Sequence, residues 1–302
     1  MRVLIVGLGS IAKKHIHALK ILDDSVELFA LRSSVNSEEH DGVQDIYDFS
    51  SLPDNLNFAI VATPTSEHVS SLRQLIPYKI PLFIEKPPVA SVEEGVRINV
   101  ELQQQRILNY VAFNLRFHPV IEWLKKSITS LRIYEVQIHC GSYLPDWRPG
   151  IDYRKVYSAQ SALGGGVHLD LIHEIDYATW LFGFPDRFKS TRRKISDLEI
   201  DSYDYANYIL EYESMVISIG LNYYRRDSTR TITVVHSTGT WIADLINGSV
   251  KSHDGEILFS SQWAINSTYE KQMRYFIDCL MQGKPPMNNF QDAIKTLEIC
   301  LK

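Results

Sequence analysis

Residues 3–12 read VLIVGLGSIA, and this stretch decides the fold of the N-terminal part of the chain. Gly7 and Gly9 follow an apolar strand and precede a helix. In a dinucleotide-binding turn the first glycine makes the tight turn and the second lets the backbone approach a pyrophosphate. The third position, here Ala12, must be small so that the helix packs closely, and the helix N-terminus favours the anion. The residues expected at such a site are Gly7, Gly9, Ser10, Ile11 and Ala12.

The sequence around this motif alternates short apolar runs with helical stretches. The strands are expected at 2–6, 26–31, 57–63, 81–85 and 108–113, and the helices at 10–22, 67–76 and 92–105. Continuous apolar strands separated by helices indicate a parallel sheet that is covered on both faces. Residues 1–118 are therefore predicted to form an α/β domain, a doubly wound Rossmann fold.

The pattern changes in the rest of the chain. A helix at 119–128 leads into a strand at 132–142, and residues 205–260 alternate as strands with turn signals at 225–229, 237–240 and 246–249. An amphipathic helix is expected at 269–283. Residues 119–302 are therefore predicted to be a second, α+β domain with helices beside a mostly antiparallel sheet.

The end of the second strand predicts which cofactor is used. NAD sites usually carry a carboxylate there, which holds the ribose 2′-hydroxyl. This chain has Arg32, Ser33 and Ser34 instead, and a guanidinium with two hydroxyls suits a 2′-phosphate. NADP(H) is predicted as the preferred cofactor, with NAD(H) as the alternative.

Composition restricts the class of protein. The 302 residues are 45% hydrophobic and 22% charged, with a net charge of −5, which gives no reason to expect nucleic acid or an anionic membrane as partner. The three cysteines show no CxxC spacing and are expected to be buried free thiols. The chain shows no apolar run long enough for a membrane span, and a cytoplasmic protein is expected.

A second polar stretch, GGGVHLDLIHEID at 164–176, leaves three interpretations open. It could hold a metal, transfer a proton, or be the polar face of a helix. His168 and His173 are five residues apart, which turns them away from each other on a helix, so no metal site is predicted. Residues three apart share a helical face, which would align Asp170, His173 and Asp176.

Five motifs, which follow each other in the right order along the chain, resemble the glucose–fructose oxidoreductase / inositol dehydrogenase / MocA family. They are the glycine motif, EKPPVA at 85–90 with VATPTSEH at 61–68, NLRFHP at 114–119, and the glycine run followed by Asp170 and His173. The resemblance implies a Rossmann domain followed by an open-faced antiparallel sheet. It also implies a sugar, cyclitol or nucleotide-sugar substrate and a homodimer or homotetramer assembled through that sheet.

The resemblance also implies roles for individual residues. Lys86 corresponds to the family's catalytic lysine and His173 to its active-site histidine, with Asp170 beside it. Two residues separate Asp170 from His173, where family members more often have three. Histidine suits proton transfer near neutral pH, and the lysine ammonium would stabilise a developing alkoxide. The further residues expected along the cofactor are Ala62, Thr63, Pro64, His68, Glu85, Lys86, Asn114 and Arg116.

The loop at 143–166 resembles the subset of the family associated with bacterial surface-glycan and sialic-acid-like sugar synthesis. Its polar and aromatic side chains could hold sugar hydroxyls or phosphates, or could simply pack the loop. The residues expected at the substrate are Arg116, Trp147, Arg148, Tyr153, Arg154, Tyr157, Asp170 and His173. The three arginines at 225, 226 and 230 are predicted to lie in a solvated turn or an oligomer contact.

These observations predict an NADP-dependent oxidoreductase that acts on a sugar-type alcohol or carbonyl. One alternative is an enzyme that keeps its nicotinamide tightly bound and catalyses a redox-neutral reaction. Another is a non-catalytic NADP-sensing protein. A sensor would have no need of Lys86, Asp170 and His173, which favours the enzyme.

Overall fold

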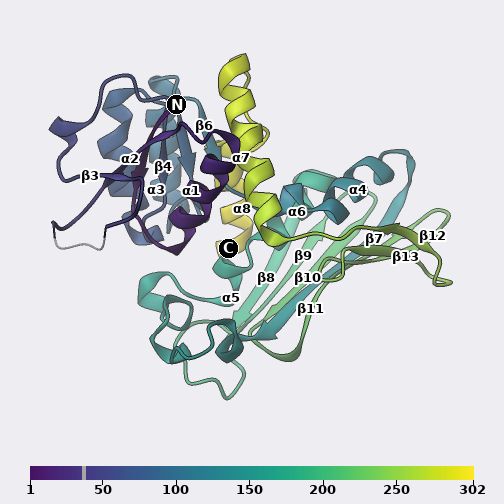
Figure 1. The fold of residues 1–302 in the computed structure, drawn as a ribbon. Coiled ribbons are helices and arrows are strands. Elements are labelled where there is room, and N and C mark those ends of the chain that lie inside the picture. Colours follow the sequence, from purple (N-terminus) through teal and green to yellow (C-terminus); the bar gives the residue numbers. More distant parts are fainter. Residues whose placement is uncertain (36–38) are drawn as a thin grey trace. The chain divides into compact units, whose positions relative to one another are not determined.

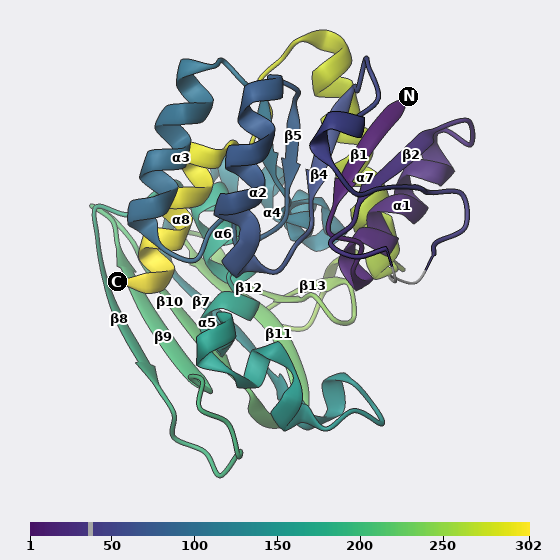
Figure 2. The same cartoon turned by 90° about the vertical axis from the view of Figure 1, so that its left-hand side faces the viewer.

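A computed structural model describes residues 1–35 and 39–302 of the chain. The described residues form two compact units (Figures 1 and 2). The first consists of residues 1–114 and 264–295, and the second of residues 115–263 and 296–302. The domain division predicted between residues 118 and 119 stays a prediction.

The first unit contains a parallel sheet of six strands in the order β3-β2-β1-β4-β5-β6. This order confirms the predicted Rossmann fold. Strands β2 and β3 lie on one side of β1 and strands β4, β5 and β6 lie on the other, so the strand order reverses between β1 and β4. Almost every residue of β1, β4 and β5 is buried, as expected for strands covered on both faces. The strands are β1 (Arg2–Val6), β2 (Glu27–Leu31), β3 (Gln44–Ile46), β4 (Phe58–Val61), β5 (Leu82–Ile84) and β6 (Asn109–Val111).

Three helices of this unit come from its N-terminal part and one comes from far along the chain. They are α1 (Ser10–Leu22), α2 (His68–Leu75), α3 (Val92–Gln104) and α7 (Ile265–Gln282). Ile16 and Leu19 of α1 share one core with Met273 and Phe276 of α7. The ring of Phe276 also meets Phe58 in the sheet, at a centroid distance of 5.1 Å. The last helix, α8 (Phe290–Leu301), begins among the residues of this unit.

The second unit contains an eight-stranded sheet in the order β14-β13-β12-β11-β7-β10-β9-β8, in which only β10 and β7 pair in parallel. Figure 2 shows its long strands side by side, with β8 at one edge. The predicted mostly antiparallel sheet is therefore confirmed. The strands are β7 (Ile133–Tyr143), β8 (Arg187–Arg193), β9 (Tyr205–Glu211), β10 (Val216–Asn222), β11 (Tyr224–His236), β12 (Gly239–Asp244), β13 (Ser249–Ser252) and β14 (Ile257–Ser260).

Burial alternates along this sheet because its two faces differ. In β9 every second residue, such as Ala206, Tyr208 and Leu210, is buried, while the residues between them are half-buried. Such alternation is typical of a sheet with one face on the core. The helices of this unit are α4 (Pro119–Ser127), α5 (Val167–Asp170) and α6 (His173–Phe182).

One predicted turn of the second unit is wrong. Residues 225–229 belong to β11, at a register shift between Tyr224 and Thr229 where β11 pairs with β7. The polar residues 225–229 favour a turn in the sequence. In the structure they continue strand β11 as an irregular stretch, which is what a β-bulge allows. The turn signals at 237–240 and 246–249 do separate β11 from β12 and β12 from β13.

The cysteines confirm a further expectation. Cys140, Cys279 and Cys300 are free and buried. Burial and the charge of Glu174 raise the pKa of the Cys140 thiol to about 12, which leaves it an unreactive thiol at neutral pH. Within residues 1–35 and 39–302, none of the helices has the length and apolar character needed to cross a membrane.

Candidate active site

The carboxyl edge of the parallel sheet gathers most of the predicted cofactor residues. Gly7 follows β1, Arg32 follows β2, Ala62 follows β4 and Glu85 follows β5. Parallel strands end at the same edge of their sheet, and doubly wound folds bind dinucleotides there, at the point where the strand order reverses. The order of the strands therefore brings these separate motifs to one edge.

The glycine turn has the geometry that a pyrophosphate requires. Gly7 has a φ of +90°, and a Cβ there would lie 2.6 Å from the backbone nitrogen of Thr63. A Cβ on Gly9, in contrast, would meet no described atom within 4 Å. Gly9 caps the N-terminus of α1 without a side-chain hydrogen bond, and no acidic residue lies in the first turn. The first N–H groups of α1 are thus open to an anion, which fits the dinucleotide.

At the end of β2 the structure adds a carboxylate that the motif lacks. Arg32 Nη1 donates to both oxygens of Asp45, at 2.9 and 3.1 Å. Asp45 lies on β3, where it pairs with Ala30 of β2, and both charged side chains are largely buried. Ser33 and Ser34 are exposed. The guanidinium expected to select a 2′-phosphate is therefore already paired with a negative charge.

The loop after β4 is joined to the loop after β5 by a buried histidine. His68 Nε2 lies 2.9 Å from the carbonyl oxygen of Thr63, and His68 Nδ1 lies 3.1 Å from that of Pro88. Burial lowers the pKa of His68, while these two carbonyls and the charge of Glu85 act in the opposite direction. Ala62 is buried and Pro64 is exposed.

Lys86 lies in the turn after β5 and is half-buried. Its backbone N–H donates to Glu85 Oε2 at 3.1 Å, and Glu85 Oε1 lies 2.6 Å from Nε2 of the buried His15. Asn114 is also buried in this unit, where its amide donates to Thr268 Oγ1 at 2.8 Å. Lys86 and Asn114 thus belong to the first unit, and His173 and Asp170 belong to the second.

In the second unit the stretch 164–176 forms two short helices and not a single helix. Helix α5 ends at Asp170 and α6 begins at His173, with Leu171 leaving the helical conformation between them. The glycines before α5 are required by the backbone. Gly164 and Gly166 have positive φ, and a Cβ on Gly165 would lie 2.1 Å from the carbonyl oxygen of Tyr157. The close approach is therefore to the chain's own loop.

Asp170 accepts hydrogen bonds from two tyrosines. The hydroxyls of Tyr157 and Tyr223 donate to its two carboxylate oxygens. Burial, followed by the charge of Asp170, raises the pKa of both phenols, so both remain donors. Asp170 itself is buried, whereas Tyr157 is 42% exposed. Tyr157 therefore links the buried carboxylate to the surface of this unit.

Two ion pairs, one buried and one partly buried, anchor the first turn of α6, which begins at His173. Arg116 donates to Asp176 with Nε at 2.9 Å and Nη2 at 2.7 Å, and the two residues are only 4% and 1% exposed. Arg230 Nε donates to the fully buried Glu174 at 2.7 Å. The solvated turn predicted for Arg230 is wrong, because the residue lies in β11 and pairs with a buried carboxylate, and the alternative of an oligomer contact stays a prediction. Asp176 faces Arg116 and Asp170 faces the tyrosines, so the interrupted helix does not place them on one stripe.

The loop before the glycines packs its aromatic and basic side chains against each other. Trp147 Nε1 donates to Ser142 at 2.8 Å, and its ring meets that of Tyr223 edge to face. The Arg148 guanidinium lies 5.9 Å from the centre of the Tyr157 ring. The hollow that these residues line measures about 10 Å³, roughly the space of one water molecule, so it does not by itself hold a sugar ring. It is lined by Leu144, Pro145, Trp147, Arg148, Ile151, Tyr153, Val156 and Ser158.

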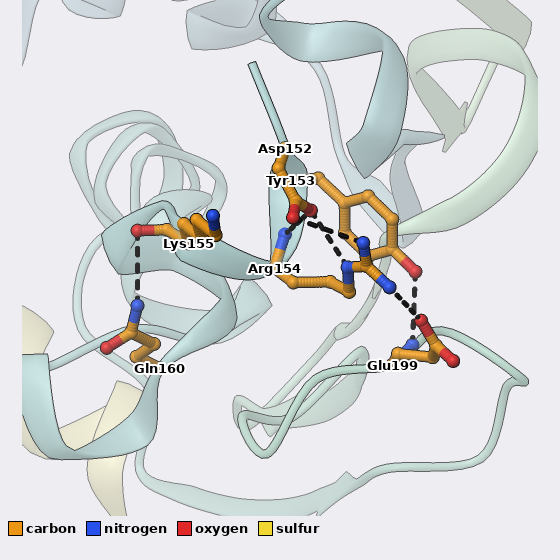
Figure 3. A network of polar contacts seen from close by, with 6 residues as sticks. All are labelled: Asp152, Tyr153, Arg154, Lys155, Gln160 and Glu199. Carbon is orange, nitrogen blue, oxygen red and sulfur yellow. Dashed lines mark hydrogen bonds and ion pairs between the residues drawn. The ribbon is translucent and has the colours of Figure 1, made fainter.

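Tyr153 and Arg154 tie this loop to residue 199 (Figure 3). Arg154 pairs with Asp152 at 2.9 Å and with Glu199 at 2.7 Å, and the Tyr153 hydroxyl accepts from the Glu199 N–H. Both charged pairs are exposed, so each contributes little stability. The contacts of Tyr153 and Arg154 therefore link the loop to the segment around residue 199.

His168 is buried and lies apart from this arrangement. Its ring meets Tyr203 edge to face at 5.5 Å, and burial, with the charge of Arg192, lowers its pKa to about 4. It is a neutral core histidine at pH 7. Across the part of the chain that the structure describes, no three His, Cys, Asp or Glu side chains gather in a way that could hold a metal ion.

Sequence reasoning did not identify three residues of this arrangement: Asp45, Tyr223 and His15. Asp45 is brought to Arg32 by the pairing of β3 with β2, and Tyr223 meets Asp170 across 53 residues. No local motif marks either residue. His15 had a usable signal, because it is a histidine on the apolar stripe of α1 with Ala12, Ile16 and Leu19.

Comparison with known proteins gives matches to both units. Residues 1–113 match the model of an oxidoreductase family with an NAD-binding Rossmann fold, GFO/IDH/MocA, and residues 131–242 match the GFO/IDH/MocA C-terminal domain. The chain is 24% identical to myo-inositol 2-dehydrogenase of Thermotoga maritima, over 97% of this chain and 92% of that protein. It is 23% identical to scyllo-inositol 2-dehydrogenase (NAD(+)) of Bacillus subtilis, over 81% of this chain and 73% of that protein.

A solved structure with the same fold is the WlbA dehydrogenase from Bordetella pertussis in complex with NADH and UDP-GlcNAcA. Its TM-score to this chain is 0.82 and its sequence identity is 19%, and the match covers 98% of this chain and 92% of that one. At this identity the likeness concerns the fold.

Proposed function

Since the chain belongs to the GFO/IDH/MocA family of oxidoreductases, we propose that it transfers a hydride between a nicotinamide cofactor and a sugar-type alcohol or carbonyl. A sugar, a cyclitol or a nucleotide sugar is the substrate class, and surface-glycan synthesis is the proposed setting. The names of the relatives support the substrate class. The observation that carries the proposal is Lys86 at the carboxyl edge of a Rossmann sheet in a chain that also presents His173 beside Asp170.

Oxidation of an alcohol carbon requires a base for the hydroxyl proton and a positive charge near the oxygen. His173 is proposed to take this proton, and to return it in the reverse direction. The Lys86 ammonium is proposed to stabilise the negative charge that develops on the oxygen. The cofactor, when bound, accepts or supplies the hydride.

Asp170 is proposed to orient the substrate or the imidazole from a fixed position. Because Tyr157 and Tyr223 both donate to it, its carboxylate is held in place. Tyr157 is the exposed member of this group and is proposed to contact a substrate hydroxyl. Trp147 and Arg148, which pack on the two tyrosines, would then shape the same surface.

The cofactor preference is proposed to be NADP(H) over NAD(H). No carboxylate follows β2 directly, and Ser33 and Ser34 offer exposed hydroxyls to a 2′-phosphate. Asp45 neutralises the charge of Arg32, so the proposed preference is modest. The affinity ratio of the two reduced cofactors, measured by nicotinamide fluorescence, tests this, and a clear preference for NADH contradicts it.

The second unit is proposed to assemble a homodimer or homotetramer through the outer face of its sheet. Ile209 and Val235 lie half-buried on that face. Ile209→Glu is expected to shift the molar mass measured by light scattering toward that of the single chain. An unchanged mass would contradict the proposal. The cytoplasmic location stays a prediction.

The test of the reaction uses a panel of sugars, cyclitols and nucleotide sugars with each nicotinamide, followed by its absorbance. Lys86→Met and His173→Gln are expected to lower kcat by about 10²- to 10⁴-fold. Reduced cofactor should still bind both variants. The exposed Lys126 and His253 supply matched controls, Lys126→Met and His253→Gln, which should retain activity.

Two outcomes would favour the alternatives. If the parent protein binds NADPH but converts no member of the panel, the sensing protein is favoured. If nicotinamide stays bound through dialysis and substrate is converted without net NADPH turnover, the redox-neutral enzyme is favoured.

A further inference from the structure

The turn that carries Lys86 is linked to the rest of the first unit through Glu85. The Glu85 carboxylate lies at the end of β5, where one oxygen accepts the backbone N–H of Lys86 at 3.1 Å. The other oxygen lies 2.6 Å from His15 Nε2. With Glu85 ionised, the imidazole donates this hydrogen bond. The carboxylate therefore joins helix α1 to the backbone of Lys86.

The far side of the same turn is linked through His68. Its two ring nitrogens lie 3.1 Å from the carbonyl oxygen of Pro88 and 2.9 Å from that of Thr63. Residues 85–88 are thus contacted at their first residue by a histidine from α1 and at their last by a histidine from α2. Lys86 lies between these two contacts.

Both histidines are buried, and His15 occupies a position on the apolar stripe of α1. His15 has no exposed surface, and its ring packs against Phe83 and Tyr269 at centroid distances of 4.9 and 5.8 Å. Burying an imidazole among such rings costs free energy unless its N–H finds an acceptor. The hydrogen bond to Glu85 supplies this acceptor, so the histidine and the carboxylate stabilise each other's burial.

We propose that His15 and His68 are positioning residues that set the place of Lys86 at the edge of the parallel sheet. This inference rests on the catalytic role proposed for Lys86. Small displacements of a catalytic group lower the rate steeply, because the reacting atoms must lie within a narrow range of distance and angle. Loss of either histidine should therefore lower kcat with little change in KM.

The first experiment compares His15→Phe with His15→Gln. Phenylalanine fills the space but cannot donate, whereas the glutamine amide can donate to Glu85 in place of Nε2. We expect His15→Phe to lower kcat by about 10- to 100-fold and His15→Gln to restore most of it. The exposed His17 on the same helix supplies the control, His17→Phe, which should change nothing.

The second experiment measures Lys86 directly and does not depend on activity. Each variant is labelled with a limiting amount of an amine-reactive reagent at several pH values, and modification of Lys86 is followed by mass spectrometry. His15→Phe and His68→Phe should change the rate and pH profile at Lys86 and leave the exposed Lys13 unaffected. Thermal unfolding identifies any variant that fails to fold, in which case His15→Gln decides the comparison.

The outcomes separate this inference from the proposed function. Equal kcat for His15→Phe and His15→Gln, with unchanged labelling of Lys86, overturns the positioning role of His15. Unchanged labelling in His68→Phe overturns that of His68. Full activity of Lys86→Met would instead overturn the catalytic role of Lys86, while the labelling result would still report where the lysine lies.

Discussion

In the first unit, Gly7, Arg32 and Lys86 lie within two residues of the ends of strands in one parallel sheet. In the second unit, Asp170 and His173 lie instead on two short helices. A strand end is fixed by the backbone hydrogen bonds of its neighbours, which almost any sequence can make. A four-residue helix such as α5 has less support of this kind: its Val167 N–H donates to the carbonyl oxygen of Tyr203 at 2.9 Å. Its position, and that of the first turn of α6, depends on side chains.

The two units also differ in the contacts that hold these residues. The first turn of α6 is anchored by the buried pair Arg116–Asp176 and by Arg230–Glu174, in which only the glutamate is fully buried. The strand ends of the first unit use glycines, the pair Arg32–Asp45 and the hydrogen bonds of His15 and His68. Substitutions are therefore expected to reduce the stability of the second unit more than that of the first.

The largest effect is expected from Arg116→Met. It leaves the carboxylate of Asp176 buried without its guanidinium, and breaking such a pair typically costs about 3–5 kcal/mol in the free energy of unfolding. Urea denaturation measures this. Combining Arg116→Met with Asp176→Leu should recover much of the lost stability, because neither position of the pair then buries a charge. A single variant as stable as the parent would show that the pair does not anchor α6.

The next effect concerns pH and His168. Its folded pKa of about 4 lies below the unfolded value of about 6.5, so the unfolded chain binds more protons between these two values. The contribution of the neutral His168 to the free energy of unfolding is therefore fully present above about pH 6.5 and is lost as the pH falls to about 4. The loss is expected to reach about 3 kcal/mol, since each pKa unit corresponds to about 1.4 kcal/mol. His168→Phe should flatten this part of the urea-derived stability profile, and an equally steep profile would contradict the prediction.

In the first unit, Asp45→Asn should change cofactor selection. The substitution removes the negative charge beside Arg32, which favours the approach of a 2′-phosphate. The ratio of NADPH to NADH affinity is expected to rise about tenfold, equivalent to about 1.4 kcal/mol. Cofactor titrations measure this ratio, and Arg32→Ala should move it in the opposite direction. If the ratio of NADPH to NADH affinity is the same in the parent, Asp45→Asn and Arg32→Ala, then neither residue distinguishes the 2′-phosphate from the 2′-hydroxyl of the ribose.

The smallest effect is expected from Arg154→Met, in the loop shown in Figure 3. Its ion pairs with Asp152 and Glu199 are exposed and screened by water, so the free energy of unfolding should hardly change. Urea denaturation beside Arg116→Met makes the comparison within one unit. A loss as large as that of Arg116→Met would contradict the distinction between exposed and buried pairs.

Sequence predicts the first unit well because its signals are local. The strand–glycine–helix pattern at residues 3–12 and the turn after β5 each depend on neighbours within a few positions. The sequence predicts Arg116 at a ligand and Arg230 in a solvated turn or an oligomer contact. No residue close to either arginine in the sequence indicates that it pairs with a carboxylate of α6. Tyr223 was missed for the same reason, because side chains that meet across more than 50 residues leave no local pattern. Asp45 was missed because its contact with Arg32 depends on the register of β3 against β2.

Helix α7 has a consequence for the order in which the chain folds. It packs beside α1 through Met273 and Phe276, although about 240 residues separate the two helices. A nascent chain emerges from the ribosome N-terminus first. The part of the apolar stripe of α1 that contacts Met273 and Phe276 is therefore uncovered until α7 has been made. The core of the first unit is completed only after the strands of the second unit have left the ribosome.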